Sequence, residues 1–238
     1  MVGILSSLGR TMIAGFVLLI AIILLFGSVD LASTAWWSFV FRWLHVSVGV
    51  MWIGLLWYFN FVQIPSMPKI ADELKPAISK VIAPEALFWF RYSALLTVLT
   101  GLIVSYLQGY AHDALLFKEG FTFENPYLAI GLGMWIAIIM AINVWFIIWP
   151  NQKKALGIIP IHVEDETEVK AIKANSAKIA MLTSRTNTLL SIPMLYPLRI
   201  ARGAGNFWNN FVLYLLWKQQ DPWEISHISL YLLGAPST

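Results

Sequence analysis

Long apolar stretches alternate with short polar ones along this chain of 238 residues. Five of the apolar stretches approach or reach the roughly 20 residues that a helix needs to cross a bilayer. They cover about residues 12–29, 37–61, 88–108, 127–149 and 177–198. A transmembrane barrel would instead show segments of about ten residues with alternating polarity. The pattern therefore predicts an all-α fold, a polytopic transmembrane helical bundle of about five spans over residues 1–198.

The polar content rises towards the C-terminal end. The fifth stretch contains Ser184, Arg185, Asn187 and Ser191, so we expect it to face protein or water rather than lipid. Beyond it, residues 207–217 (FWNNFVLYLLW) are too few to cross a bilayer and are rich in Trp, Tyr and Asn, which is typical of an interfacial helix. Residues 199–238 are therefore predicted to form a C-terminal tail with an amphipathic interfacial helix.

Composition and charge refine this prediction. Hydrophobic residues make up 58% of the chain and charged residues 12%, whereas about a quarter of a soluble domain is charged. The net charge is +3, but the basic residues lie in loops between apolar stretches, a pattern that orients spans and does not indicate nucleic-acid binding. Lysines gather in 65–87 and 150–178, whereas 109–126 is mainly acidic, so we expect a cytoplasmic N-terminus. The absence of cysteine excludes disulfides, thiolate metal sites and covalently attached c-type haem.

A polar stripe runs along the second predicted span. Its members share near-helical spacing and are predicted to face the bundle interior: Arg42, His45, Gly49, Trp52, Phe59 and Gln63. Gly49 leaves space beside the His45 imidazole, which suits a flat cofactor such as haem b with His45 as the axial ligand of its iron. We therefore name His45, Gly49, Trp52 and Arg42 as candidate cofactor-binding residues. The alternative is that His45 hydrogen-bonds a neighbouring helix and that Gly49 serves close helix packing.

Further polar residues lie in the third, fourth and fifth predicted spans. Asn143 either binds a polar ligand or caps a kinked helix end before Pro150. Arg185 requires an anion, carbonyl groups or water, and Asn187 and Ser191 are expected to line the same cavity. The candidate substrate-binding residues are therefore Asn143, Arg185, Asn187 and Ser191. Arg91 opens the third predicted span, where its side chain is expected to snorkel to the membrane surface.

Four segments, in order, resemble the N-terminal membrane domain of the bacterial membrane-bound urate hydroxylase (urate oxidase) family. They are WLHVSVGVMWIGLLWYFNFVQIP (43–65), WFRYSALLTVLTG (89–101), NVWFIIWPNQKKAL (143–156) and SRTNTLLSIPMLY (184–196). The resemblance implies a place in the bacterial inner membrane, oxidation of urate towards 5-hydroxyisourate, and transfer of electrons to a cytochrome c module. Full-length members of the family carry that module at their C-terminus, and this chain has no cysteine with which to build one. A separate cytochrome c is therefore the expected partner.

Two functional hypotheses follow. The first is a redox enzyme of the urate hydroxylase type, in which an arginine and amide side chains recognise the planar urate anion. The second is a non-catalytic accessory subunit that packs, within the lipid bilayer, against a larger energy-transducing membrane complex. The missing electron exit and the 12 tryptophans motivate the second hypothesis.

Overall fold

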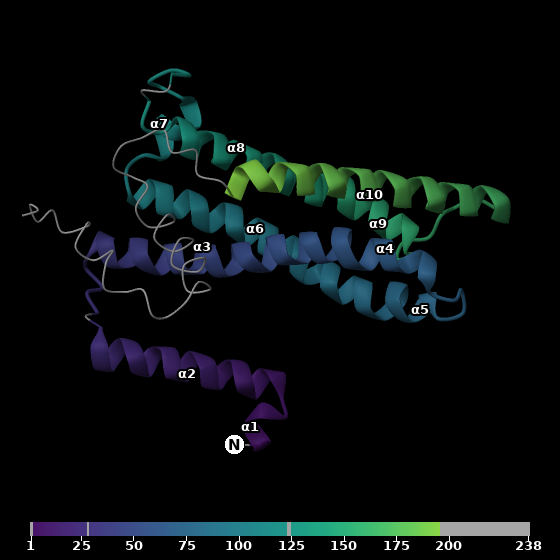
Figure 1. Cartoon of the computed structure of the whole chain (residues 1–238), viewed down its shortest axis with the longest axis horizontal. Coiled ribbons are helices and arrows are strands. Elements are labelled where there is room, and N and C mark those ends of the chain that lie inside the picture. The colour runs from purple at the N-terminus through teal and green to yellow at the C-terminus, as the bar shows by residue number, and fades with distance from the viewer. Residues whose placement is uncertain (1, 28, 123–124, 196–238) are drawn as a thin grey trace, which may run out of the picture. The chain divides into compact units, whose positions relative to one another are not determined.

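The computed structural model describes residues 2–27, 29–122 and 125–195. Every regular element in these ranges is a helix, so the predicted all-α class is confirmed (Figure 1). The chain forms two compact units, residues 1–111 and 112–238. The predicted boundary at residue 198 and the predicted interfacial helix at 207–217 lie outside the described ranges.

The first unit begins with two helices that carry almost no polar side chains. Helix α1 covers Val2–Leu5 and helix α2 covers Leu8–Phe26. No residue of α2 is buried, although most of its 19 residues are apolar. A helix that is apolar on all sides and buries nothing in its own chain is the form expected of a membrane span surrounded by lipid.

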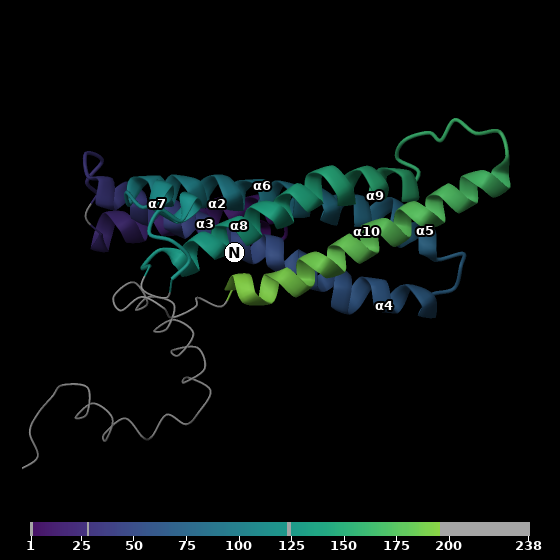
Figure 2. The same ribbon diagram turned by 90° about the horizontal axis from the view of Figure 1, so that it is seen from above.

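The rest of the first unit consists of two long helical segments. One runs without a break through α3 (Thr34–Trp57), the π-helical turn η1 (Tyr58–Gln63), α4 (Ile64–Ser66) and the 3₁₀ turn η2 (Met67–Lys69). After a short loop, the other runs through α5 (Lys75–Ala77), the π-helical turn η3 (Ile78–Ile82) and α6 (Ala83–Leu107). Helices α3 and α6 lie side by side and antiparallel in both views (Figures 1 and 2).

The core of the first unit lies between α3 and α6. Trp52 and Leu56 are completely buried on α3, and Phe90 and Ala94 are buried on α6. Nearer the η1 end, Phe59 meets Phe90 edge to face at a ring separation of 5.7 Å. Apolar burial between helices does not drive association inside lipid, so this close packing itself provides much of the stabilisation.

The second unit is also built on an antiparallel pair. Helix α8 (Leu128–Ile142), the π-helical turn η4 (Asn143–Ile148) and α9 (Trp149–Ala155) form one continuous segment, which packs along α10 (Glu166–Leu195). Gly157 follows the end of α9 with a φ of +70°, the left-handed conformation that commonly ends helices and that glycine adopts without strain. The chain then turns back into α10.

A short helix, α7 (Ala111–Leu116), covers the first turns of α8. A Cβ atom on Gly131 would lie 2.3 Å from the carbonyl oxygen of Ala114, so only glycine permits this approach of the two backbones. One turn along α8, the indole Nε1 of Trp135 donates a hydrogen bond to the carbonyl oxygen of Leu115 at 3.0 Å.

Within the described residues, four helical segments are long and apolar enough to cross a membrane, which makes the chain a multi-pass membrane protein by helix length and composition. They are Leu8–Phe26, Thr34–Lys69, Lys75–Leu107 and Leu128–Ala155, and each contains most of one predicted span. The predicted fifth span, 177–198, falls on α10 as far as Leu195, and α10 is not one of the four. Its first turns carry Glu166, Glu168 and several lysines, which lower the hydropathy of the helix.

Candidate functional site

The site around His45 lies on the face of α3 that packs against α6. The His45 Nδ1 is 2.9 Å from the backbone carbonyl oxygen of Thr97 and 3.3 Å from the hydroxyl of Thr100. A carbonyl oxygen only accepts, so the hydrogen is on Nδ1 and Nε2 keeps its lone pair. No hydrogen bond to Nε2 is found within the described part of the chain. The imidazole is thus held in one tautomer, with one nitrogen available as a ligand.

Gly101 of α6 forms the wall against which this ring rests. A Cβ atom at position 101 would lie 2.9 Å from Cε1 and 3.2 Å from Nδ1 of His45. No carbon atom fits at that distance, so the absence of a side chain at Gly101 allows the ring to occupy its position. The ring therefore has a fixed orientation as well as a fixed tautomer.

The other predicted cofactor-binding residues lie along the same stripe. Gly49 faces α6, where a Cβ would make an ordinary contact of 3.8 Å with the Thr97 methyl group. Trp52 is 0% exposed, and its Nε1 has no hydrogen-bond partner in the described ranges. A buried indole N–H normally has an acceptor, so the position calls for a water or a ligand. Arg42 is half-buried and lies about one turn before His45 on α3.

Three α6 residues that the sequence analysis did not single out complete this site. Thr97 and Thr100 hold the ring through the carbonyl oxygen and the hydroxyl, and Gly101 provides the space. These three residues lie within about one helical turn of α6, opposite His45. The sequence alone does not identify them, because the pairing and the register of α3 and α6 must be known first.

The expectation for Arg91 is wrong. Its side chain is buried, with 8% of the residue exposed, and does not snorkel to a surface. The reason is that the helix starts well before the predicted span: α6 begins at Ala83 and continues a helical segment from Lys75. Arg91 therefore lies inside the helix and not at its first turn.

In the second unit, two predicted substrate-binding residues meet each other. The Asn143 Nδ2 donates to the Asn187 Oδ1 at 2.8 Å, and the Asn187 Nδ2 donates to the carbonyl oxygen of Met140 at 2.9 Å. Asn187 is 0% exposed. Asn143 does not cap a helix end, because the helical segment continues through Pro150 to Ala155. The two amides therefore link α10 to the α8–η4 junction.

The structure does not bring Arg185 to this pair. Arg185 is exposed, whereas Asn187, two residues later on the opposite side of α10, is buried. Ser191 is fully buried one turn beyond Asn187, and its hydroxyl donates to the carbonyl oxygen of Thr188 at 2.7 Å. The buried positions of α10 form a stripe of small and polar residues, Ser176, Ala180, Ser184, Asn187 and Ser191. Such stripes permit close helix packing in membranes.

No group of three or more His, Cys, Asp or Glu side chains within the described residues is placed to hold a bare metal ion. A single imidazole is enough for haem, because the porphyrin brings four nitrogen ligands of its own. The donor set at His45 fits that cofactor: Nε2 is the free ligand, and Nδ1 donates to a backbone carbonyl, as metal-bound histidines commonly do.

Comparison with known proteins finds no family model, no curated protein and no solved structure that matches this chain.

Proposed function

We propose that this chain is a membrane redox protein of the urate hydroxylase type that holds haem b through His45. The observation that carries the proposal is the hydrogen bond from Nδ1 to the Thr97 carbonyl oxygen at 2.9 Å. This bond leaves Nε2 unprotonated and orients the ring, as second-shell partners do for metal-bound histidines.

The residues around His45 would perform the protein's part of the chemistry. Gly101 lets the His45 ring lie directly against α6. The buried Nε1–H of Trp52 would donate a hydrogen bond to a bound group. When bound, haem b supplies a centre that accepts and releases single electrons. Packing of α3 against α6 keeps this part of the chain rigid, which limits the rearrangement that accompanies each electron transfer.

The substrate and partner in this proposal come from the resemblance of the four segments. Hydroxylation of urate by water releases two electrons and two protons for each 5-hydroxyisourate formed. Cytochrome c carries one electron, so two molecules of a separate cytochrome c would be reduced per urate. Asn143 and Asn187 hydrogen-bond each other, and we therefore assign them to helix packing rather than to the substrate.

The proposal is tested with the purified full chain in detergent. We expect about one haem b per chain in a pyridine haemochromogen assay, and urate-dependent reduction of added cytochrome c in a ratio of two to one. If the chain contains haem but does not reduce cytochrome c in the presence of urate, urate is not the substrate, and the proposed haem site still holds. Chain without haem would remove the redox proposal altogether.

One observation favours the second candidate, a non-catalytic subunit of a larger membrane complex. His45 and Gly49 already have a complete structural role, since they join α3 to α6 without any cofactor. In that case the protein would co-purify in a stable complex, and His45→Gln would leave the activity of the complex unchanged. A haem signal that depends on His45 would contradict this candidate.

A further inference from the structure

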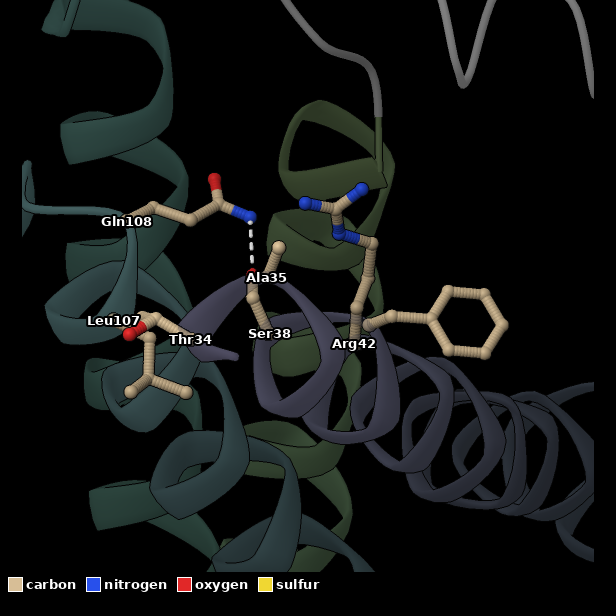
Figure 3. A pocket seen from close by; sticks show the side chains of 7 residues that line it. Thr34, Ala35, Ser38, Arg42, Leu107 and Gln108 are labelled. Carbon is tan, nitrogen blue, oxygen red and sulfur yellow. Dashed lines mark hydrogen bonds between the residues drawn. The ribbon is translucent and has the colours of Figure 1, made fainter. Parts of the chain in front are cut away.

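A hollow of about 450 Å³ lies where the start of α3 and the end of α6 come together (Figure 3). It is open at the surface of the molecule, and all its lining residues belong to the first unit. Its lining combines polar side chains with apolar ones that flank them: Thr34, Ser38, Arg42 and Gln108, with Phe39 and Leu107. The hollow is thus large enough for a small molecule and has polar groups on one side.

Two helices position the polar groups. The Gln108 Nε2 donates to the Ser38 hydroxyl at 3.0 Å, which fixes the carboxamide across the α3–α6 interface. In Figure 3 the guanidinium of Arg42 and the carboxamide of Gln108 extend to the same side of α3, with Ser38 between them. An arginine fork and an amide that face the same space can bind the oxygens of an anion together.

Arg42 has no acidic partner in the described part of the chain. The ion pairs found there are Lys75–Asp72 and Lys118–Asp113. No carboxylate lines the hollow, and the nearest acid before α3, Asp30, accepts a hydrogen bond from the backbone N–H of Ala32 at 3.1 Å. A half-buried guanidinium inside a candidate membrane span is costly without a counter-charge.

We propose that this hollow binds a small anion through its oxygens, held by Arg42 and Gln108. The anionic oxygen belongs either to a soluble molecule, such as a carboxylate, phosphate or enolate, or to the phosphate of a lipid headgroup. Phe39 and Leu107 provide apolar contact for the body of that molecule. This inference does not depend on haem at His45, because His45 does not line the hollow and the test measures binding alone.

The soluble arm of the test is calorimetric titration of the purified full chain, in neutral detergent, with urate and with inorganic phosphate. The lipid arm measures by mass spectrometry how much phosphatidylglycerol stays bound after washing, compared with phosphatidylcholine. Binding in the first arm identifies a soluble anion, and retention only in the second identifies a headgroup.

The variants decide whether Arg42 is responsible. We expect Arg42→Gln to weaken binding at least tenfold, and Arg42→Lys to retain an intermediate affinity because it keeps the charge but loses the fork. Arg10→Gln, which removes an exposed arginine near the start of α2, is the matched control and should bind as the original chain does. A helical circular dichroism spectrum and an unchanged melting temperature show that each variant is folded. No anion binding in either arm, or equal binding by folded Arg42→Gln, would overturn the proposal.

Discussion

At the scale of single residues, His45 is defined by what it touches on α6. The backbone carbonyl of Thr97 cannot be changed by mutation, but Gly101 can, and it lies against the other side of the same ring. The pair Gly101 and Gly54 therefore gives a direct test of the site. Both are helical glycines, yet a Cβ at Gly54 would have nothing within 4 Å.

Gly101→Ala should displace the imidazole, because the new methyl group would lie 2.9 Å from Cε1. We expect a loss of about 1–3 kcal/mol in the free energy of unfolding, as in other overpacked interiors. Gly54→Ala should be neutral or slightly stabilising, since alanine favours helix more than glycine does. Thermal unfolding in detergent measures both variants. Equal melting temperatures would show that the ring does not rest on Gly101.

Tyr110 provides a test in the alkaline range. Burial raises the pKa of its phenol, and the positive charge of Arg42 opposes that effect. The folded chain therefore keeps the phenolic proton to a higher pH than the unfolded chain does. The resulting contribution to stability is complete below the unfolded pKa of about 10 and is lost as the pH rises through the folded value.

We expect the melting temperature to fall less steeply in Tyr110→Phe than in the original chain between about pH 9 and pH 11. Other tyrosines and lysines ionise equally in both proteins, so they cancel in the comparison. Identical slopes would mean that Tyr110 is as accessible in the folded state as in the unfolded one.

The sequence was sufficient to place His45, Gly49 and Trp52 on one inward-facing stripe, because helical spacing alone determines which residues share a face. It was not sufficient to find Thr97 and Gly101. Their role depends on the register between two helices, and small residues at many registers would satisfy the same pattern. Arg185 was expected beside Asn187, but residues two apart on a helix point in nearly opposite directions.

At the scale of elements, the Asn143–Asn187 pair links the two halves of the second unit. Asn187→Ala removes the bond from Asn143 and the bond to Met140, and it leaves the Asn143 amide without its partner. We expect a loss of about 1–3 kcal/mol in the free energy of unfolding. Arg185→Ala, on the exposed side of α10, should stay within about 0.5 kcal/mol of the original chain. Similar losses from both variants would contradict the assignment of Asn187 to packing.

The apolar stretches predicted the positions of the four helical segments in the described ranges that are long and apolar enough to cross a membrane, since hydropathy depends on composition alone. They did not predict how far the helices extend. The second predicted span ends at 61, whereas the helical segment continues to Lys69 past Pro65 and Pro68. The π-helical turns η1, η3 and η4 accommodate an extra residue without ending the helix. A proline stands two residues after each turn, at Pro65, Pro84 and Pro150.

At the scale of the whole molecule, the absence of cysteine makes the membrane topology directly testable. The charge pattern predicts that Glu119 lies outside and Glu73 lies in the cytoplasm, and both side chains are exposed on loops. A membrane-impermeant maleimide should therefore label Glu119→Cys in intact cells and should label Glu73→Cys only after permeabilisation. Labelling in the opposite order would reverse the predicted orientation.

Leu18→Cys, in the middle of α2, completes that experiment. Leu18 is exposed in the folded chain, so only lipid would shield a cysteine at this position. We expect no labelling in membranes, with or without permeabilisation, and full labelling after denaturation in detergent. Labelling in intact membranes would show that α2 lies in water or lines an aqueous path.

The central claim is that His45 holds haem b, and the absorbance spectrum of the purified chain, oxidised and then reduced with dithionite, tests it most directly. We predict a Soret band that shifts on reduction, a large loss of that band in His45→Ala, and partial recovery when free imidazole fills the space that the mutation leaves. Gly54→Ala, prepared in parallel, should keep the full band. A chain without a Soret band, or a His45→Ala variant with an unchanged spectrum, would contradict the claim and leave His45 as a helix-packing residue.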